Sequence, residues 1–202
     1  MVLAIGATLV HPSMNAWGLS AGGVIGGGLI GAVLAQRVAM TAMPELVAIL
    51  HSFVGLAAVL VGISSYLAPG HELHGAEKIV HMVEIWLGVA IGAVTFTGSV
   101  IAWAKLRGTL GGKPTLLPGR HALNGLVALA IVGGVVPFCM DAMAADASTT
   151  VGIALLAGMT TLASLLGVHL VMAIGGADMP VVVSLLNSYS GWAAAAAGFM
   201  LG

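Results

Sequence analysis

The chain is 202 residues long, and its composition excludes several classes of protein. Hydrophobic residues make up 59% of it and charged residues only 6%, whereas soluble domains carry about 25% charged residues. The mean hydropathy of +1.12 agrees. These values exclude a soluble enzyme and a disordered segment, and the six Lys and Arg residues are too few for a nucleic-acid-binding surface. Cys139 is the only cysteine, which excludes a disulfide-stabilised scaffold.

The remaining class is an all-α, polytopic transmembrane bundle, because helices satisfy their own backbone hydrogen bonds in lipid. A transmembrane helix needs about 20 mostly apolar residues, and the sequence predicts about seven spans. We expect residues 1–202 to form a single transmembrane domain. Since the first span is short and the last reaches the end of the chain, we also expect a fragment truncated at both ends. The predicted spans are Met1–Val10, Trp17–Gln36, Pro44–Leu67, Ile79–Ala104, His121–Phe138, Ser148–Ala173 and Pro180–Leu201.

The Lys and Arg residues predict how the spans are oriented, because cytoplasmic connections carry an excess of these residues. Counting the spans alternately puts all but one of them on the same side, which we predict to be cytoplasmic, together with residues 175–178. Only Lys78 falls on the opposite side. The residues on the predicted cytoplasmic side are Arg37, Lys105, Arg107, Lys113 and Arg120.

A glycine-rich segment at residues 26–31 matches the G-x-G-x-x-G pattern of dinucleotide-binding sites. That pattern requires a preceding strand and a βαβ unit, whereas this segment lies inside an apolar span. Gly23, Gly27 and Gly31 are spaced four residues apart, and small residues at this spacing allow helix backbones to approach closely. We therefore interpret the glycines as a helix-packing surface.

Two histidines near the opposite side, His71 and His74, flank Glu72. A metal site is the alternative to a solvated loop, and we favour the loop because no third ligand is anchored beside them. His121 and His169 lie near span ends, where both can extend towards the interface.

Three further ionisable residues, Glu77, His81 and Glu84, share one helix face at the outer end of the fourth predicted span. Two interpretations stay open for them. They form either an interfacial ion-pair cluster or the entry of a proton path on that side.

His51 lies deep inside its span, about 10 Å from the start at Pro44. An ionisable group at that depth is costly and indicates function, and imidazole binds and releases protons near neutral pH. The alternative is a neutral histidine hydrogen-bonded across helices. Ser99 and Asn187 lie about 9 and 10 Å from the same side of their own spans. We therefore predict one polar cluster of these three residues with Thr95 and Thr97 near it.

This set of residue types limits the chemistry of the cluster. No carboxylate lies at the level of His51, Ser99 and Asn187, so they form no hydrolytic triad. One imidazole does not make a metal-coordination shell either. A histidine, an amide and a hydroxyl are able to relay a proton, and we predict that role.

Long segments of the chain resemble the membrane region of the beta subunit of proton-translocating NAD(P) transhydrogenase. The resemblance extends over nearly the whole chain from about Trp17 onward. The segments that carry it are Met43–Gly55, Gly92–Ser99, Gly175–Ser184 and Leu186–Ala193.

The resemblance implies an enzyme that couples hydride transfer between NAD(H) and NADP(H) to proton movement across a bacterial inner membrane. The membrane histidine of the family falls on His51, its serine on Ser99, its asparagine on Asn187 and a loop aspartate on Asp178. NAD(H) and NADP(H) are expected in soluble domains outside this chain, which would itself hold no cofactor and no metal. The implied partners are the alpha-subunit helices, the NADP(H)-binding domain of the same subunit, lipid and a second copy of the assembly, and not nucleic acid.

The resulting hypothesis is a gated proton path. A proton enters near Glu77, His81 and Glu84, reaches His51, and leaves towards the segment that contains Asp178. A stand-alone proton or ion channel or transporter and a passive membrane anchor are the alternatives. Proton flux through the chain alone would distinguish a channel, and loss of function on replacing His51 would exclude an anchor.

Overall fold

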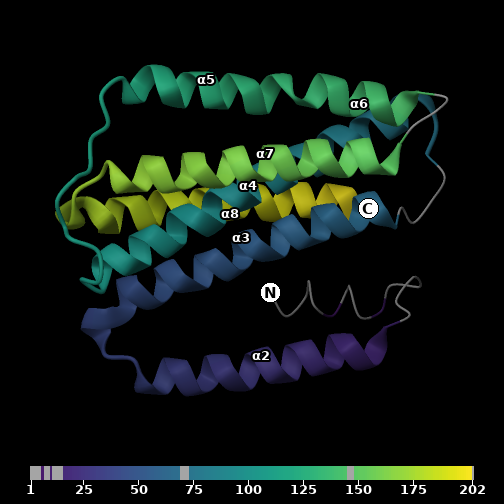
Figure 1. Cartoon of the computed structure of the whole chain (residues 1–202). Helices are drawn as coiled ribbons and strands as arrows, with labels where there is room; N and C mark the ends of the chain where they lie inside the picture. Colours follow the sequence, from purple (N-terminus) through teal and green to yellow (C-terminus); the bar gives the residue numbers. More distant parts are fainter. Residues whose placement is uncertain (1–5, 7–9, 11–15, 69–72, 145–147, 202) are drawn as a thin grey trace. The chain divides into compact units, whose positions relative to one another are not determined.

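The computed structural model describes residues 6, 10, 16–68, 73–144 and 148–201, and in these ranges all regular structure is helical (Figure 1). The all-α prediction is therefore confirmed. Most of the predicted span Met1–Val10 lies outside the described residues, as do His71 and Glu72. The chain divides into two compact units, Met1–Met43 and Pro44–Gly202, which are described separately below.

The first unit contains the helix α2, Trp17–Arg37, and the short 3-10 helix η1, Met40–Ala42. Residues 26–31 lie in the middle of α2, so the nucleotide-binding pattern has no strand before it. The helix also ends one residue later than predicted. Arg37 occupies its last turn, where a cation interacts favourably with the helix dipole.

The second unit contains the remaining helices, and its spans agree closely with the sequence prediction. Pro44 and Pro180 both lie in the first turn of a helix, where the missing N–H is not needed. The elements are α3 (Met43–Leu67), α4 (Gly75–Leu106), α5 (Arg120–Gly133), α6 (Val135–Met143), α7 (Thr149–Met172), η2 (Gly176–Asp178) and α8 (Met179–Leu201).

Five helical segments are long and apolar enough to cross a membrane, with α5 and α6 counted as one. The helix α8 is also 23 residues long, and its apolar sequence is interrupted by the polar residues 187–190. The chain is thus a multi-pass membrane protein, and the described residues account for five or six of the predicted spans.

The fifth predicted span differs from the structure at its second half. We expected it to end at Phe138, whereas helix continues to Met143 after a break at Gly134. Pro137 explains the break, because proline lacks an N–H and its ring clashes with the carbonyl four residues earlier. The two pieces, α5 and α6, lie end to end (Figure 1).

The buried apolar residues of the second unit form two clusters. One surrounds Trp86, and the centroid of its indole ring lies 5.1 Å from the centroid of the Phe138 phenyl ring. The other surrounds Met179 and Leu186, near the start of α8. Between the two clusters, residues 95–99 of α4 contribute buried hydroxyl groups. The core therefore contains a polar layer at the depth predicted for the functional cluster.

The helices α3 and α4 approach each other closely at Gly55. A Cβ atom added there would lie 2.6 Å from the backbone nitrogen of Phe96 and 2.7 Å from the carbonyl oxygen of Gly92. A Cβ added at Gly62 would clash with the side chain of Val89. Small residues permit this backbone contact, as is typical of membrane helix pairs.

We expect Gly55→Ala to destabilise the fold by on the order of 1–3 kcal/mol, because the two backbones would have to separate. Gly158→Ala on α7 is the matched control, since a Cβ there meets no described atom within 4 Å and alanine favours a helix. Thermal unfolding in detergent micelles measures both. Equal unfolding temperatures for the two variants would contradict the close contact.

Candidate proton-binding site

His51 lies on α3 and contacts Asn187 of α8. Its Nε2 atom is 2.9 Å from the Oδ1 atom of Asn187, and its Nδ1 atom is 2.6 Å from the carbonyl oxygen of Val47. The second contact is local, because Val47 lies one turn earlier on the same helix. The first joins two helices whose residues are 136 positions apart in the sequence. The structure thus brings together two of the predicted site residues.

The two hydrogen bonds of His51 accommodate both protonation states of its ring. With Oδ1 of Asn187 towards the ring, both ring nitrogens donate, as in imidazolium. If the amide turns by half a rotation, its NH₂ group donates to an unprotonated Nε2 atom while Nδ1–H still donates to Val47. The oxygen and the NH₂ group of an amide have nearly the same shape, so both orientations fit the site. Asn187 is therefore a suitable partner for a group that gains and loses a proton.

Ser99 lies at the same level on α4 but makes no hydrogen bond with His51. Its side chain is fully buried, and its Oγ atom has no hydrogen-bond partner among the described residues. The close contacts of α4 fix this level: a Cβ at Gly98 would meet Leu186, the neighbour of Asn187 in sequence. A buried hydroxyl without a partner is costly, so Ser99 is a group available to a rearranged side chain or to water.

The two threonines near Ser99 are already hydrogen-bonded. Thr95 donates to the carbonyl oxygen of Ile91 at 2.7 Å. Thr97 is placed to donate to the carbonyl oxygens of Ala93, at 3.0 Å, and of Ser164 on α7, at 2.9 Å. Thr97 thus joins α4 to α7. Among the described residues, neither threonine hydroxyl forms a hydrogen bond with His51.

The surface around the His51–Asn187 pair is open in this chain. Asn187 is exposed and His51 is half-buried. A polar pair at this depth in lipid would lose its hydrogen bonds to water without gaining others. The pair therefore requires protein or water on its open side.

His81 and Glu84 lie near the other end of α4. The Nδ1 atom of His81 is 3.9 Å from the Oε2 atom of Glu84, and its Nε2 atom is 3.2 Å from the Oγ atom of Ser65 on α3. Glu77 is exposed. About 27 Å of helix separates His81 from Ser99, and the contact at Gly55 lies between them. The structure therefore keeps the outer group apart from His51.

Asp178 is the last residue of η2 and immediately precedes α8. Its side chain is exposed and makes no hydrogen bond with a described residue. Its backbone N–H donates to the carbonyl oxygen of Gly175 at 3.1 Å. The carboxylate is thus free to meet another molecule or domain at this end of the bundle.

Lys105 differs most from the sequence interpretation. Its position predicted a cation in a cytoplasmic connection, but the residue is only 5% exposed. It belongs to the last turn of α4, and its ammonium group donates to backbone carbonyl oxygens at the end of α7. Sequence reasoning missed this arrangement because the acceptors are main-chain atoms, which leave no signal in the sequence.

A second histidine–asparagine pair was also missed. The Nδ1 atom of His169 on α7 lies 2.6 Å from the Oδ1 atom of Asn124 on α5, and its Nε2 atom is buried without a described partner. His169 therefore pairs across helices instead of reaching the interface. His121 is exposed and accepts a hydrogen bond from Arg120 at 3.2 Å. Depth counting places both residues about one turn inside their helices, but it does not give the rotation that brings their side chains together.

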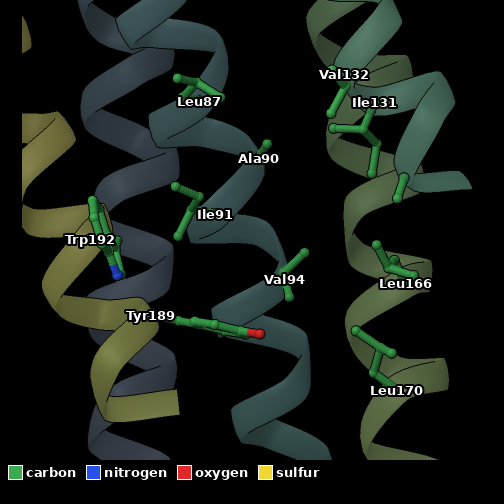
Figure 2. Close-up of a pocket in the computed structure, with 11 residues that line it drawn as sticks. Leu87, Ala90, Ile91, Val94, Ile131, Val132, Leu166, Leu170, Tyr189 and Trp192 are labelled. Atoms are coloured by element: carbon green, nitrogen blue, oxygen red, sulfur yellow. The ribbon is translucent and has the colours of Figure 1, made fainter. Parts of the chain in front are cut away.

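Neither a metal centre nor a polar pocket is formed by these residues. No three His, Cys, Asp or Glu side chains come together within the described ranges. A groove of about 380 Å³ lies between α4, α5, α7 and α8, and it contains none of the predicted site residues (Figure 2). Its lining is apolar apart from the ends of two aromatic rings. The lining residues are Leu87, Ala90, Ile91, Val94, Ala128, Ile131, Val132, Leu166, Leu170, Tyr189 and Trp192.

Comparison with known proteins gives a consistent result over the whole chain. The family model described as NAD(P) transhydrogenase beta subunit matches residues 1–202. The NAD(P) transhydrogenase subunit beta of Rhodospirillum rubrum is 47% identical over 205 residues, which cover 100% of this chain and 42% of that protein. The same subunit from a named strain of R. rubrum gives the same values. The chain therefore spans less than half the length of these relatives.

Proposed function

We propose that this chain, which belongs to the family of NAD(P) transhydrogenase beta subunits, is a membrane domain that couples hydride transfer between NAD(H) and NADP(H) to proton movement. The observation that carries the proposal is the hydrogen bond between His51 and Asn187, which joins α3 and α8 deep in the membrane. Ionisable residues at such depth are rare and mark ion or proton paths. The assignment of nicotinamide nucleotides as substrates rests on the names of the relatives.

His51 is the proton carrier in this proposal. Histidine is the side chain best suited to bind and release a proton near neutral pH. Asn187 stabilises either charge state by turning its amide, and the hydroxyl of Ser99, which has no partner in the described part of the chain, lies at the same level. The three residues together offer hydrogen-bond donors and acceptors to a moving proton, and this role does not require a metal ion.

Coupling requires that His51 is open to one side of the membrane at a time. Protons arrive from the outer end near Glu77, His81 and Glu84 only when the helices move, because the backbone contact at Gly55 closes the α3–α4 interface. Two states that differ in access satisfy this requirement. The close contact disfavours the alternative of a permanently open channel, which needs a continuous path.

The other end of the bundle contacts the NADP(H)-binding domain of the same subunit. Asp178 presents its carboxylate there, and the connection after α4 lies beside it, since Gly176 N–H donates to the carbonyl oxygen of Gly112 at 2.8 Å. Both nucleotides bind in soluble domains, and this chain holds neither. Asp178 then responds to the state of His51 through the position of α8.

The remaining partners follow from the open side of the His51–Asn187 pair. Helices of the alpha subunit, or of the rest of the beta subunit, cover this surface and exclude lipid from it. The complete assembly is a homodimer in a bacterial inner membrane. A stand-alone channel or transporter and a passive anchor are the competing functions.

We expect His51→Ala to abolish proton-coupled hydride transfer in the complete enzyme, because the proton carrier at mid-depth is lost. Proton uptake and hydride transfer are measured together in sealed proteoliposomes. His74→Ala is the control, since this exposed residue makes no helix-capping hydrogen bond. Wild-type pumping by His51→Ala would remove His51 from the mechanism and favour the anchor. Proton flux without nucleotide would favour the channel.

Asn187→Leu is expected to reduce coupled turnover more than Asn187→Asp. Leucine removes both the donor and the acceptor that face His51, whereas aspartate keeps an acceptor and favours the protonated ring. The expected order is wild type, aspartate, leucine, and the same proteoliposome assay measures it. The reverse order of the two variants would exclude the proposed partnership with His51.

Asp178→Asn is expected to lower coupled turnover while expression and the unfolding temperature stay close to wild type. The exposed carboxylate makes no described hydrogen bond that the fold would lose. Steady-state turnover and thermal unfolding in detergent are the two measurements. A large fall in unfolding temperature would instead identify Asp178 as a helix cap.

A further inference from the structure

The ammonium group of Lys105 is held entirely by main-chain oxygens. Its Nζ atom lies 3.2 Å from the carbonyl oxygen of Val171, 2.8 Å from that of Met172 and 2.6 Å from that of Ile174. An ammonium group has three donors, so these contacts use all of them. Among the described residues no carboxylate forms an ion pair with it. A buried lysine arranged in this way acts as a fixed link between two chain segments.

These oxygens belong to the end of α7 and to the residues that follow it. The last carbonyls of a helix lack donors within the helix and lie at the negative end of its dipole. Backbone N–H groups of Ile174 and Thr115 also donate to the Val171 and Met172 oxygens, so Lys105 adds a charged donor to carbonyls at the negative end of α7. In doing so it joins the last turn of α4 to the last turn of α7.

The same end of α7 is joined to the connection that follows α4. Thr115 N–H donates to the carbonyl oxygen of Met172 at 3.0 Å, so that oxygen accepts from both Thr115 and Lys105. Gly176 N–H donates to Gly112 at 2.8 Å. The segment 172–176 is thus held on two sides, and the next residues are η2 and the start of α8.

We propose that Lys105 is a positioning residue that transmits movement of α4 at the level of His51 to the segment that contains Asp178. The inference rests on the proposed function. Ser99 and Lys105 lie on α4 with about 9 Å of helix between them. Asn187 and Asp178 lie on α8 and at its entry, so a displacement between α4 and α8 moves the attached segment with it.

The test replaces Lys105 in the complete enzyme. Lys105→Met keeps the length of the buried stem and removes the three hydrogen bonds, whereas Lys105→Arg keeps charge and donors. Lys78→Met is the matched control, because Lys78 also donates to a carbonyl near a helix end, that of Ala142 in α6, at 2.5 Å. It lies at the opposite end of α4.

We expect Lys105→Met to lower coupled turnover at least about tenfold, and Lys105→Arg to retain at least about a third of it. Lys78→Met should change the unfolding temperature by a similar amount with turnover within about twofold of wild type. The double variant Lys105→Met with Asp178→Asn should be no slower than the slower single variant, because coupled residues do not act additively.

A second readout separates transmission from simple stabilisation. Ala177→Cys is labelled with a membrane-impermeant maleimide, and its labelling rate is compared between His51 and a permanently charged His51→Arg background. We expect a change of at least about threefold that disappears with Lys105→Met and persists with Lys78→Met.

Three results would overturn the inference. They are a Lys105→Met variant that behaves like Lys78→Met, multiplicative losses in the double variant, and a labelling change that survives Lys105→Met. If Lys105→Met does not accumulate, Lys105→Gln takes its place in every comparison. An active His51→Ala variant would instead overturn the proposed function, so the two failures are distinguishable.

Discussion

The helices α3 and α4 meet through their backbones at Gly55 and Gly92, and this close contact fixes the height of one helix relative to the other. Going from Gly55 towards the start of α3, the next turn carries His51, and the matching direction along α4 leads to Ser99. The helix α8 joins the same level because a Cβ at Gly98 would touch Leu186. Side chains larger than glycine would separate the helices and move the polar groups apart.

Polar groups inside the bundle find their partners mainly in carbonyl oxygens. Thr97 reaches Ser164 on α7, Trp86 donates to Ile131 on α5, and Lys105 donates to the end of α7. Each contact joins two helices at a fixed height. Lipid offers no hydrogen-bond acceptor in the hydrocarbon core, so a donor there has to find its acceptor within the protein. The bundle is therefore held in register by hydrogen bonds as well as by close packing.

Two features of the site favour a moving part over a rigid one. His51 and Asn187 lie on the open surface of the bundle, while Ser99 is buried at the same level and has no hydrogen-bond partner among the described residues. Both arrangements leave polar groups that a second helix packing would satisfy differently. The hydrogen bonds of Lys105 and Gly176 connect α4 to the segment before the exposed Asp178. A change in the charge of His51 is thereby linked to the end of the bundle at which Asp178 lies.

The sequence by itself determined the class of protein, the limits of most helices and the depth of His51, Ser99 and Asn187. These properties depend on apolar length, proline position and a constant rise per residue, which are all local. Tertiary structure alone decided which of the residues at one depth touch, because depth does not give rotation about the helix axis. It placed Asn187 on His51, left Ser99 apart, paired His169 with Asn124 and buried Lys105. For Lys105 the acceptors are main-chain oxygens, which every residue carries, so only the folded chain reveals them.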